Sequence, residues 1–134
     1  MTAVIYLGYS RGFSLHKKRP IDDLIVRANE ALGKNDYESA KKAYSDIRNE
    51  FAKLSDGEKK KVKPVLIQIG DKTNVCFIRG KLSEASNLVL AGKKEEAAEV
   101  YKSILSVYPS ISQEFKNEVF AGCEKLHKAI SGTA

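Results

Sequence analysis

The chain has 134 residues, enough for one domain whose hydrophobic core needs no disulfide or metal. Its hydrophobic fraction of 43% and charged fraction of 30% are typical of globular proteins, and with no Trp and three Pro it is not a Pro-rich or low-complexity sequence. Two cysteines, Cys76 and Cys123, are too few for a disulfide framework, and both have apolar neighbours. We expect buried, reduced thiols in a reducing compartment.

Residues 1–20 form a basic N-terminal arm that we expect to be flexible. The net charge of the chain is +6, and the arm supplies four basic residues and no acidic one: Arg11, Lys17, Lys18 and Arg19. Its apolar run, residues 3–7, is too short to cross a bilayer or to form a signal-peptide core, which predicts a cytoplasmic protein without a membrane span. A strand at residues 4–7 would find no partner strand elsewhere in the chain. The folded body is then residues 21–134.

The folded body is predicted to contain six helices, because apolar residues recur at three- and four-residue spacing. The first helix begins near Pro20, where Asp22 and Asp23 favour the positive end of the helix dipole. Asp36 caps the second helix. The apolar stripe of the second helix contains Ala40, Ala43, Tyr44, Ile47, Phe51 and Leu54.

The third helix is predicted to begin at a capping-box pattern in residues 55–58, where a serine is followed three positions later by a glutamate. Pro64 lies inside the apolar pattern and lacks a backbone N–H, so a kink or a late start is expected there. Gly70 and Asp71 are expected to end the helix.

The fourth helix, about residues 74–91, is apolar over most of its circumference and is expected to be the most buried element. Gly92 supplies the left-handed residue that separates it from the fifth helix. The fifth helix ends at Pro109. A serine, Ser110 or Ser112, caps the sixth helix, which extends to about residue 130.

The second half of the body repeats the first at a fixed period of 57 residues. The shift that carries Tyr44 onto Tyr101 superposes the two helix–turn–helix segments without a gap. It also pairs Ile21 with Ile78, Ala28 with Ala85, Ala40 with Ala97, Ile47 with Ile104 and Val62 with Val119. A fixed period with matched apolar positions predicts a helical-repeat architecture. The expected fold is all-α, with six helices as two repeated three-helix units, residues 21–77 and 78–134, stacked into one right-handed helical-repeat domain.

The two helical hairpins resemble the tetratricopeptide repeat (TPR), in which small residues allow close helix crossing and an aromatic residue fills the space beyond it. The matching residues are Ala28 and Ala85 at the crossing, Gly92 in the turn (replaced by Asn35 in the first hairpin), Ala40 and Ala97 in the second helix, Tyr44 and Tyr101 four residues later, and Pro109 at the end. The additional third helix departs from the TPR period of about 34 residues. Three-helix units of this kind also resemble MIT domains, which rank second because the charged third-helix pattern of that family is missing.

The TPR resemblance implies a protein–protein interaction module, an adaptor or scaffold, whose groove binds a peptide or an amphipathic helix. The first helix of each hairpin lines that groove, and the candidate partner-binding residues there are Asp22, Asn29, Arg79, Ser83 and Ser86. The alternative is a nucleic-acid-binding protein that uses the arm and a basic run. Its candidate contacts to phosphate or to an acidic partner are Arg11, Lys17, Lys18, Arg19, Lys59, Lys60, Lys61 and Lys63.

The sequence predicts a non-enzymatic protein without a cofactor or a metal. His16 and His127 lie far apart in sequence and belong to no metal-spaced cluster, and no nucleophile has an obvious acid–base partner. Residues 8–12 lack the Gly-Lys-Ser/Thr ending of a phosphate loop. Tyr44 and Tyr101 are expected to fill space between helices and not to bind a ligand. The expected partner is a protein or peptide, and the chain itself is expected to be a monomer or a weak homodimer.

Overall fold

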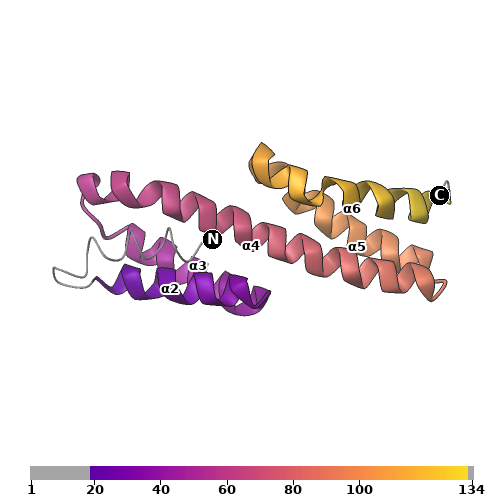
Figure 1. The fold of residues 1–134 in the computed structure, drawn as a ribbon, viewed down its shortest axis with the longest axis horizontal. Helices are drawn as coiled ribbons and strands as arrows, with labels where there is room; N and C mark the ends of the chain where they lie inside the picture. The colour runs from indigo at the N-terminus through magenta and orange to yellow at the C-terminus, as the bar shows by residue number, and fades with distance from the viewer. Residues whose placement is uncertain (1–18, 133–134) are drawn as a thin grey trace. The chain divides into compact units, whose positions relative to one another are not determined.

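The computed structural model describes residues 19–132, and every regular element in this range is helical (Figure 1). The elements are α2 (Pro20–Gly33), α3 (Tyr37–Phe51), α4 (Asp56–Leu90), α5 (Lys94–Val107), the 3₁₀-helix η1 (Tyr108–Ser110) and α6 (Gln113–Ser131). The predicted all-α class is confirmed for this part of the chain. The strand considered for residues 4–7 and the expected flexibility of the arm lie outside the described residues.

The prediction of six helices is wrong, because the third and fourth expected helices are one helix. Five α-helices occur in the described range, and α4 runs without a break through 35 residues. Gly70 does not end the helix but makes room for a neighbour: a Cβ atom at this position would lie 2.8 Å from the hydroxyl oxygen of Tyr44. Asp71 is only 8% exposed, and Thr73 donates its hydroxyl to the Ile69 carbonyl at 2.7 Å. Polar residues at this point of α4 are therefore packed inside the protein and do not form a turn.

The late helix start considered at Pro64 is also wrong, since α4 begins at Asp56. The predicted capping box supplies that start: the Glu58 backbone N–H donates to the Ser55 hydroxyl at 3.3 Å. A proline inside a helix leaves the carbonyl four residues earlier without its usual donor. Both Pro64 and Lys60, which carries that carbonyl, are exposed, so water can take the place of the missing donor.

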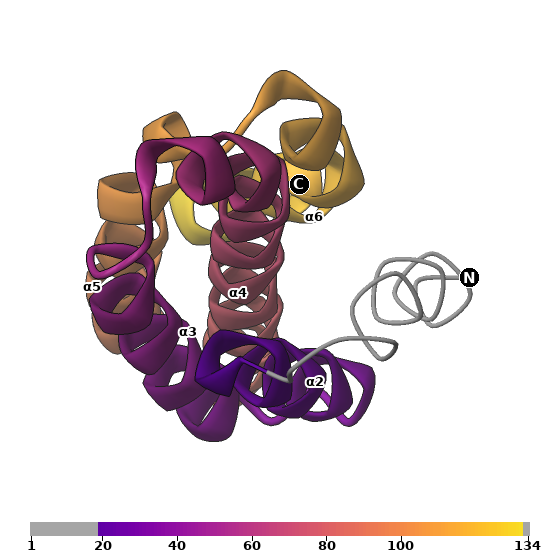
Figure 2. The ribbon, with the colours of Figure 1, turned by 90° about the vertical axis from the view of Figure 1, so that its left-hand side faces the viewer.

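The chain divides into two compact units at the boundary between Thr73 and Asn74, so that α4 contributes its first part to one unit and its second part to the other. In the first unit, α2 and α3 pack side by side with the first part of α4 around one hydrophobic core (Figure 2). The buried residues of this core are Ile21, Ile25, Ala28, Ala43, Ile47, Val62 and Ile69. Two of them, Ala43 and Ile47, belong to the apolar stripe predicted for the second helix.

The second unit has its own core, formed by the second part of α4 with α5 and α6. Its buried residues are Val75, Ile78, Ala85, Ala97, Ile104, Ile111, Val119, Cys123 and Leu126. Cys76 and Cys123 are both buried and form no disulfide bond, as the sequence predicts. The second part of α4 is not buried on all sides, because many of its side chains are exposed, among them Arg79, Ser83 and Ser86.

The turn before the second helix of each hairpin has the same backbone character in both units. Asn35 adopts φ of 56° and Gly92 adopts φ of 80°, which are left-handed conformations that Asn and Gly tolerate best. The Asp36 carboxylate then accepts a hydrogen bond from the Ser39 backbone N–H at 3.1 Å, which confirms the predicted cap of α3. The two turns lie 57 residues apart, at the period of the repeat.

Two glycine substitutions in α4 should have opposite effects on stability. Gly80→Ala should raise the free energy of unfolding by about 0.5–1 kcal/mol, because alanine is the better helix former and no atom lies within 4 Å of the added methyl group. Gly70→Ala should lower it by roughly 1–3 kcal/mol, because the methyl group would overlap the Tyr44 ring. Urea denaturation followed by circular dichroism measures both.

A double-mutant cycle checks the cause of the Gly70 effect. In a Tyr44→Leu background the overlapping ring is absent, so Gly70→Ala should cost clearly less than it does alone. Equal costs in the two backgrounds would show that the Tyr44 contact does not explain why Gly70 is needed.

Candidate functional site

An open groove of about 380 Å³ lies on the second unit, between the second part of α4 and α6. It is lined by Leu82, Ser83, Ser86, Val89 and Leu90 from α4 and by Gly122, Lys125, Leu126 and Ala129 from α6. Leu90 is 86% exposed at the edge of this groove. Such apolar exposure beside a concave apolar surface is typical of binding sites.

The two helices approach each other closely at a glycine of this groove. A Cβ atom at Gly122 would lie 2.9 Å from a methyl carbon of Leu82, so a larger residue would require the leucine side chain to move. Nearby, the Arg79 guanidinium and the Glu118 carboxylate form an ion pair at 2.9 Å. Arg79 comes before Leu82 on α4, and their neighbours Glu118 and Gly122 come in the same order on α6. The two helices therefore run in the same direction.

Helical spacing then places one row of side chains at each edge of the groove. On α4 the row is Arg79, Ser83, Ser86 and Leu90, and on α6 it is Glu118, Gly122, Lys125 and Ala129, each spaced by three or four residues. Half of these side chains are small, and between the rows lie the half-buried Leu82 and Val89, with the buried Leu126 beneath them. The arrangement is an apolar floor between two low walls.

Lys125 is the charged side chain among those that line the groove. It is exposed and forms no ion pair with any described residue. The other charges nearby neutralise each other: Arg79 pairs with Glu118, and Glu124 lies 3.9 Å from Lys128. The groove is therefore apolar at its floor with one uncompensated positive charge at its wall.

Two of the five predicted partner-binding residues, Ser83 and Ser86, line this groove, and a third, Arg79, lies one turn before Ser83 on α4. The other two lie in the first unit and have structural contacts. Asn29 donates its side-chain amide to the Ile25 carbonyl at 3.0 Å, and Asp22 is only 2% exposed. Asp22 is thus buried and does not face a partner.

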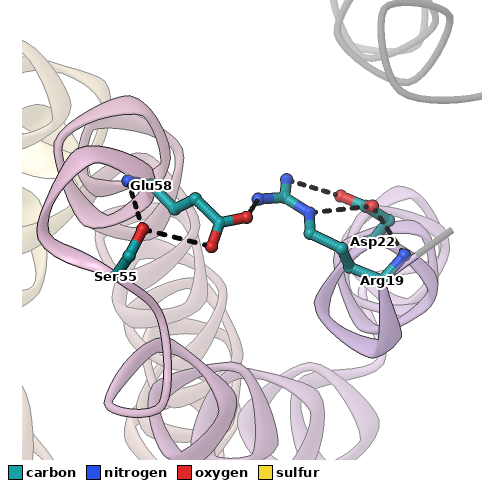
Figure 3. Close-up of polar contacts among 4 residues, drawn as sticks. All are labelled: Arg19, Asp22, Ser55 and Glu58. Carbon is teal, nitrogen blue, oxygen red and sulfur yellow. Dashed lines mark hydrogen bonds and ion pairs between the residues drawn. The ribbon is translucent and has the colours of Figure 1, made fainter. Parts of the chain in front are cut away.

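Asp22 belongs to a polar cluster that fixes the start of α2 (Figure 3). Arg19 precedes the helix, is 16% exposed, and places its guanidinium 3.2 Å from the Asp22 carboxylate and 2.8 Å from the Glu58 carboxylate. Glu58 also accepts a hydrogen bond from the Ser55 hydroxyl at 3.3 Å. Arg19, predicted as a phosphate contact, instead links the first turns of α2 and α4.

The predicted basic run lies near the start of α4. Lys60, Lys61 and Lys63 are exposed, Lys59 is half-buried, and none of the four forms an ion pair with a described residue. The other predicted phosphate contacts, Arg11, Lys17 and Lys18, lie outside the described residues.

A second, smaller groove of about 270 Å³ lies between α5 and α6, and the sequence reasoning did not identify it. It is lined by Tyr101, Leu105, Tyr108, Phe120, Cys123, Glu124 and His127. The spacing of Cys123 and His127, four residues apart on one helix, could have predicted that they share a face. Burial raises the pKa of the Cys123 thiol, which keeps it protonated and a poor nucleophile near neutral pH.

Neither metal-binding nor membrane-spanning features are found in the described part of the chain. Residues 19–132 contain no group of three or more His, Cys, Asp or Glu side chains placed to hold a metal ion. Within the same range, no helix is both long and apolar enough to cross a bilayer. Scans against models of protein families, curated proteins and solved structures found no match.

Asp22→Ala should lower the free energy of unfolding by about 1–3 kcal/mol, because it removes the buried carboxylate to which Arg19 donates. Glu38→Ala is the matched control, since Glu38 is also an acid in the first turn of a helix but is exposed. It should cost less than about 1 kcal/mol. Equal costs would mean that Asp22 contributes only through the helix dipole.

Stability should also depend on pH through Glu58. The hydrogen bond from Arg19 lowers the pKa of Glu58, so the folded state favours the charged carboxylate. The stabilisation is complete above the ordinary glutamate pKa of about 4.3 and disappears as the pH falls through the lowered value. The stability difference between the native sequence and Glu58→Gln should therefore shrink in acid, as measured by thermal melts from pH 7 to pH 3. In an Arg19→Met background most of this pH dependence should vanish.

Proposed function

We propose that this chain is a non-enzymatic protein–protein interaction module, an adaptor or scaffold, that presents the α4–α6 groove to an amphipathic helix of a partner protein. The observation that carries the proposal is the exposed Leu90 beside an apolar floor of Leu82, Val89 and Leu126. Covering this surface would remove apolar area from water, which is the main driving force of helix-in-groove recognition.

The dimensions of the groove favour a helix as the occupant. Its α4 wall runs from Leu82 to Leu90, which corresponds to about 12 Å, or roughly two helical turns. A partner helix offers apolar side chains at positions i, i+3 or i+4 and i+7 over the same distance. The small residues Ser83, Ser86 and Ala129 leave space for such side chains.

The TPR-like relation of the two hairpins is part of the proposal. Its support is that the small residues at matched positions are all fully buried: Ala28, Ala40, Ala85 and Ala97. Burial of alanine at these positions is expected where two helix axes approach closely. Proteins built from such hairpins commonly use the exposed surfaces of their helices to bind other proteins.

Two further grooves in the described part of the chain fit an amphipathic helix less well. The groove between α2 and α3 is lined by six charged residues, Arg27, Glu30, Lys34, Asp36, Lys42 and Asp46, which would have to lose water on binding. The groove between α5 and α6 is smaller, although Leu105 and Phe120 are exposed there. This second apolar surface provides an internal comparison for the experiment below.

A non-enzymatic role is supported by the described titratable groups whose pKa is shifted. Burial raises the pKa of Cys123 and Tyr101, which makes both groups less reactive at neutral pH. Hydrogen bonding lowers the pKa of Asp36 and Glu58, which cap helices or pair with Arg19. None of these shifts produces an activated acid, base or nucleophile.

Nucleic-acid binding is the second candidate function, and the exposed, unpaired Lys60, Lys61 and Lys63 favour it. Binding through phosphate contacts weakens by orders of magnitude between about 50 and 200 mM salt. Under this alternative, a single-stranded oligonucleotide should bind with that salt dependence, and replacing the three lysines with alanine should abolish binding.

The proposal predicts that a synthetic amphipathic peptide binds at the α4–α6 groove. The peptide carries leucines at i, i+3, i+4 and i+7 and an uncharged polar face, and fluorescence anisotropy measures its affinity. Leu90→Asp should weaken binding by at least about tenfold, because the leucine no longer adds buried apolar area. Leu90 is exposed, so this variant should remain folded.

Leu105→Asp is the matched control, since Leu105 is an exposed leucine of the same unit that lines the α5–α6 groove. It should leave the affinity unchanged, and the affinity should vary little with salt. Loss of binding in Leu105→Asp but not in Leu90→Asp would show that the peptide binds the α5–α6 groove, which would contradict the proposal. No binding to the native protein would refute the proposed function.

A further inference from the structure

We infer that the partner helix carries an acidic residue beside its apolar stripe and that this carboxylate pairs with Lys125. The inference rests on the proposed function, because it concerns the occupant of the same α4–α6 groove. It adds the sign of the partner's charge, which the apolar floor alone does not determine.

The first argument is that α6 offers Lys125 no counter-charge. A lysine on a helix can pair with an acid three or four residues away. Around Lys125 these positions hold Ala121, Gly122, Lys128 and Ala129. The acid directly before Lys125, Glu124, lies 3.9 Å from Lys128.

The second argument is that the facing wall of the groove offers none either. The α4 residues that line the groove are Leu82, Ser83, Ser86, Val89 and Leu90, and none of them is charged. At the end of the groove, Glu118 already pairs with Arg79 at 2.9 Å. Lys125 is therefore a positive charge that faces an uncharged α4 wall, with the nearest acid of that wall's end already paired.

The third argument concerns what binding would do to this charge. A helix that covers the apolar floor removes water from the Lys125 ammonium group, which is unfavourable unless a negative group replaces the water. A partner with an acidic flank supplies that group, whereas a basic amphipathic helix adds repulsion between like charges. Charge complementarity thus selects an acidic amphipathic helix from the helices that fit the groove by shape.

The test compares two synthetic peptides with the same leucine positions, one with glutamates and one with lysines beside the apolar stripe. Fluorescence anisotropy at about 150 mM salt should give an affinity for the glutamate peptide at least about fivefold higher than for the lysine peptide. In Lys125→Glu this preference should reverse. The residue is exposed, so the variant should stay folded, and circular dichroism checks this.

Lys61→Glu is the matched control, because Lys61 is also exposed and unpaired among the described residues but lies in the first unit. It should keep the preference for the glutamate peptide. If Lys61→Glu removes the preference and Lys125→Glu does not, the attraction belongs to the basic run of α4 and the inference is overturned.

The two proposals fail in different ways. Equal affinity for both peptides, with binding still weakened by Leu90→Asp, would overturn the inference about charge and leave the proposed function intact. Failure of the glutamate, lysine and uncharged peptides alike to bind the native protein would overturn both.

Discussion

Both hydrophobic cores take residues from one helix, α4, which continues through Gly70. The helix supplies Val62 and Ile69 to the core of the first unit and Val75, Ile78 and Ala85 to the core of the second. At Gly70 the absence of a side chain lets the Tyr44 ring lie against the helix backbone. A glycine that weakens a helix in isolation is here kept in the helix by the packing that it permits.

This contact also shows the limit of predicting the fold from the sequence: features set by local periodicity and capping were predicted correctly, but a contact between distant residues was not. The apolar stripes identified the buried residues of each helix, because burial follows helical periodicity. The caps at Asp36 and Ser55 were recognised, since capping depends on local hydrogen bonds. The meaning of Gly70 was not recognised, because a glycine that ends a helix and a glycine that accommodates a distant tyrosine look the same in sequence.

The candidate site was predicted in part for a similar reason. Helical spacing places Arg79, Ser83 and Ser86 on an exposed helix face, and Ser83 and Ser86 line the groove. Asp22 was assigned to the same kind of face, but Arg19 draws its carboxylate into a buried ion pair. Lys125 and Gly122 were not predicted, because their role depends on which helix α6 packs against. Periodicity identifies the exposed and buried faces of a helix but not its neighbours.

The position of the boundary between Thr73 and Asn74, inside a helix, has a consequence for dissecting the protein. The start of a helix leaves four backbone N–H groups without intrahelical acceptors, and natural helices satisfy some of them with a capping side chain. The second unit has no such start of its own, because its first helix continues from the unit before it. A fragment that begins at Asn74 would therefore need a new helix start. Asparagine is among the residue types that cap helices best, so the cut would turn a residue from inside α4 into the cap of a shorter helix.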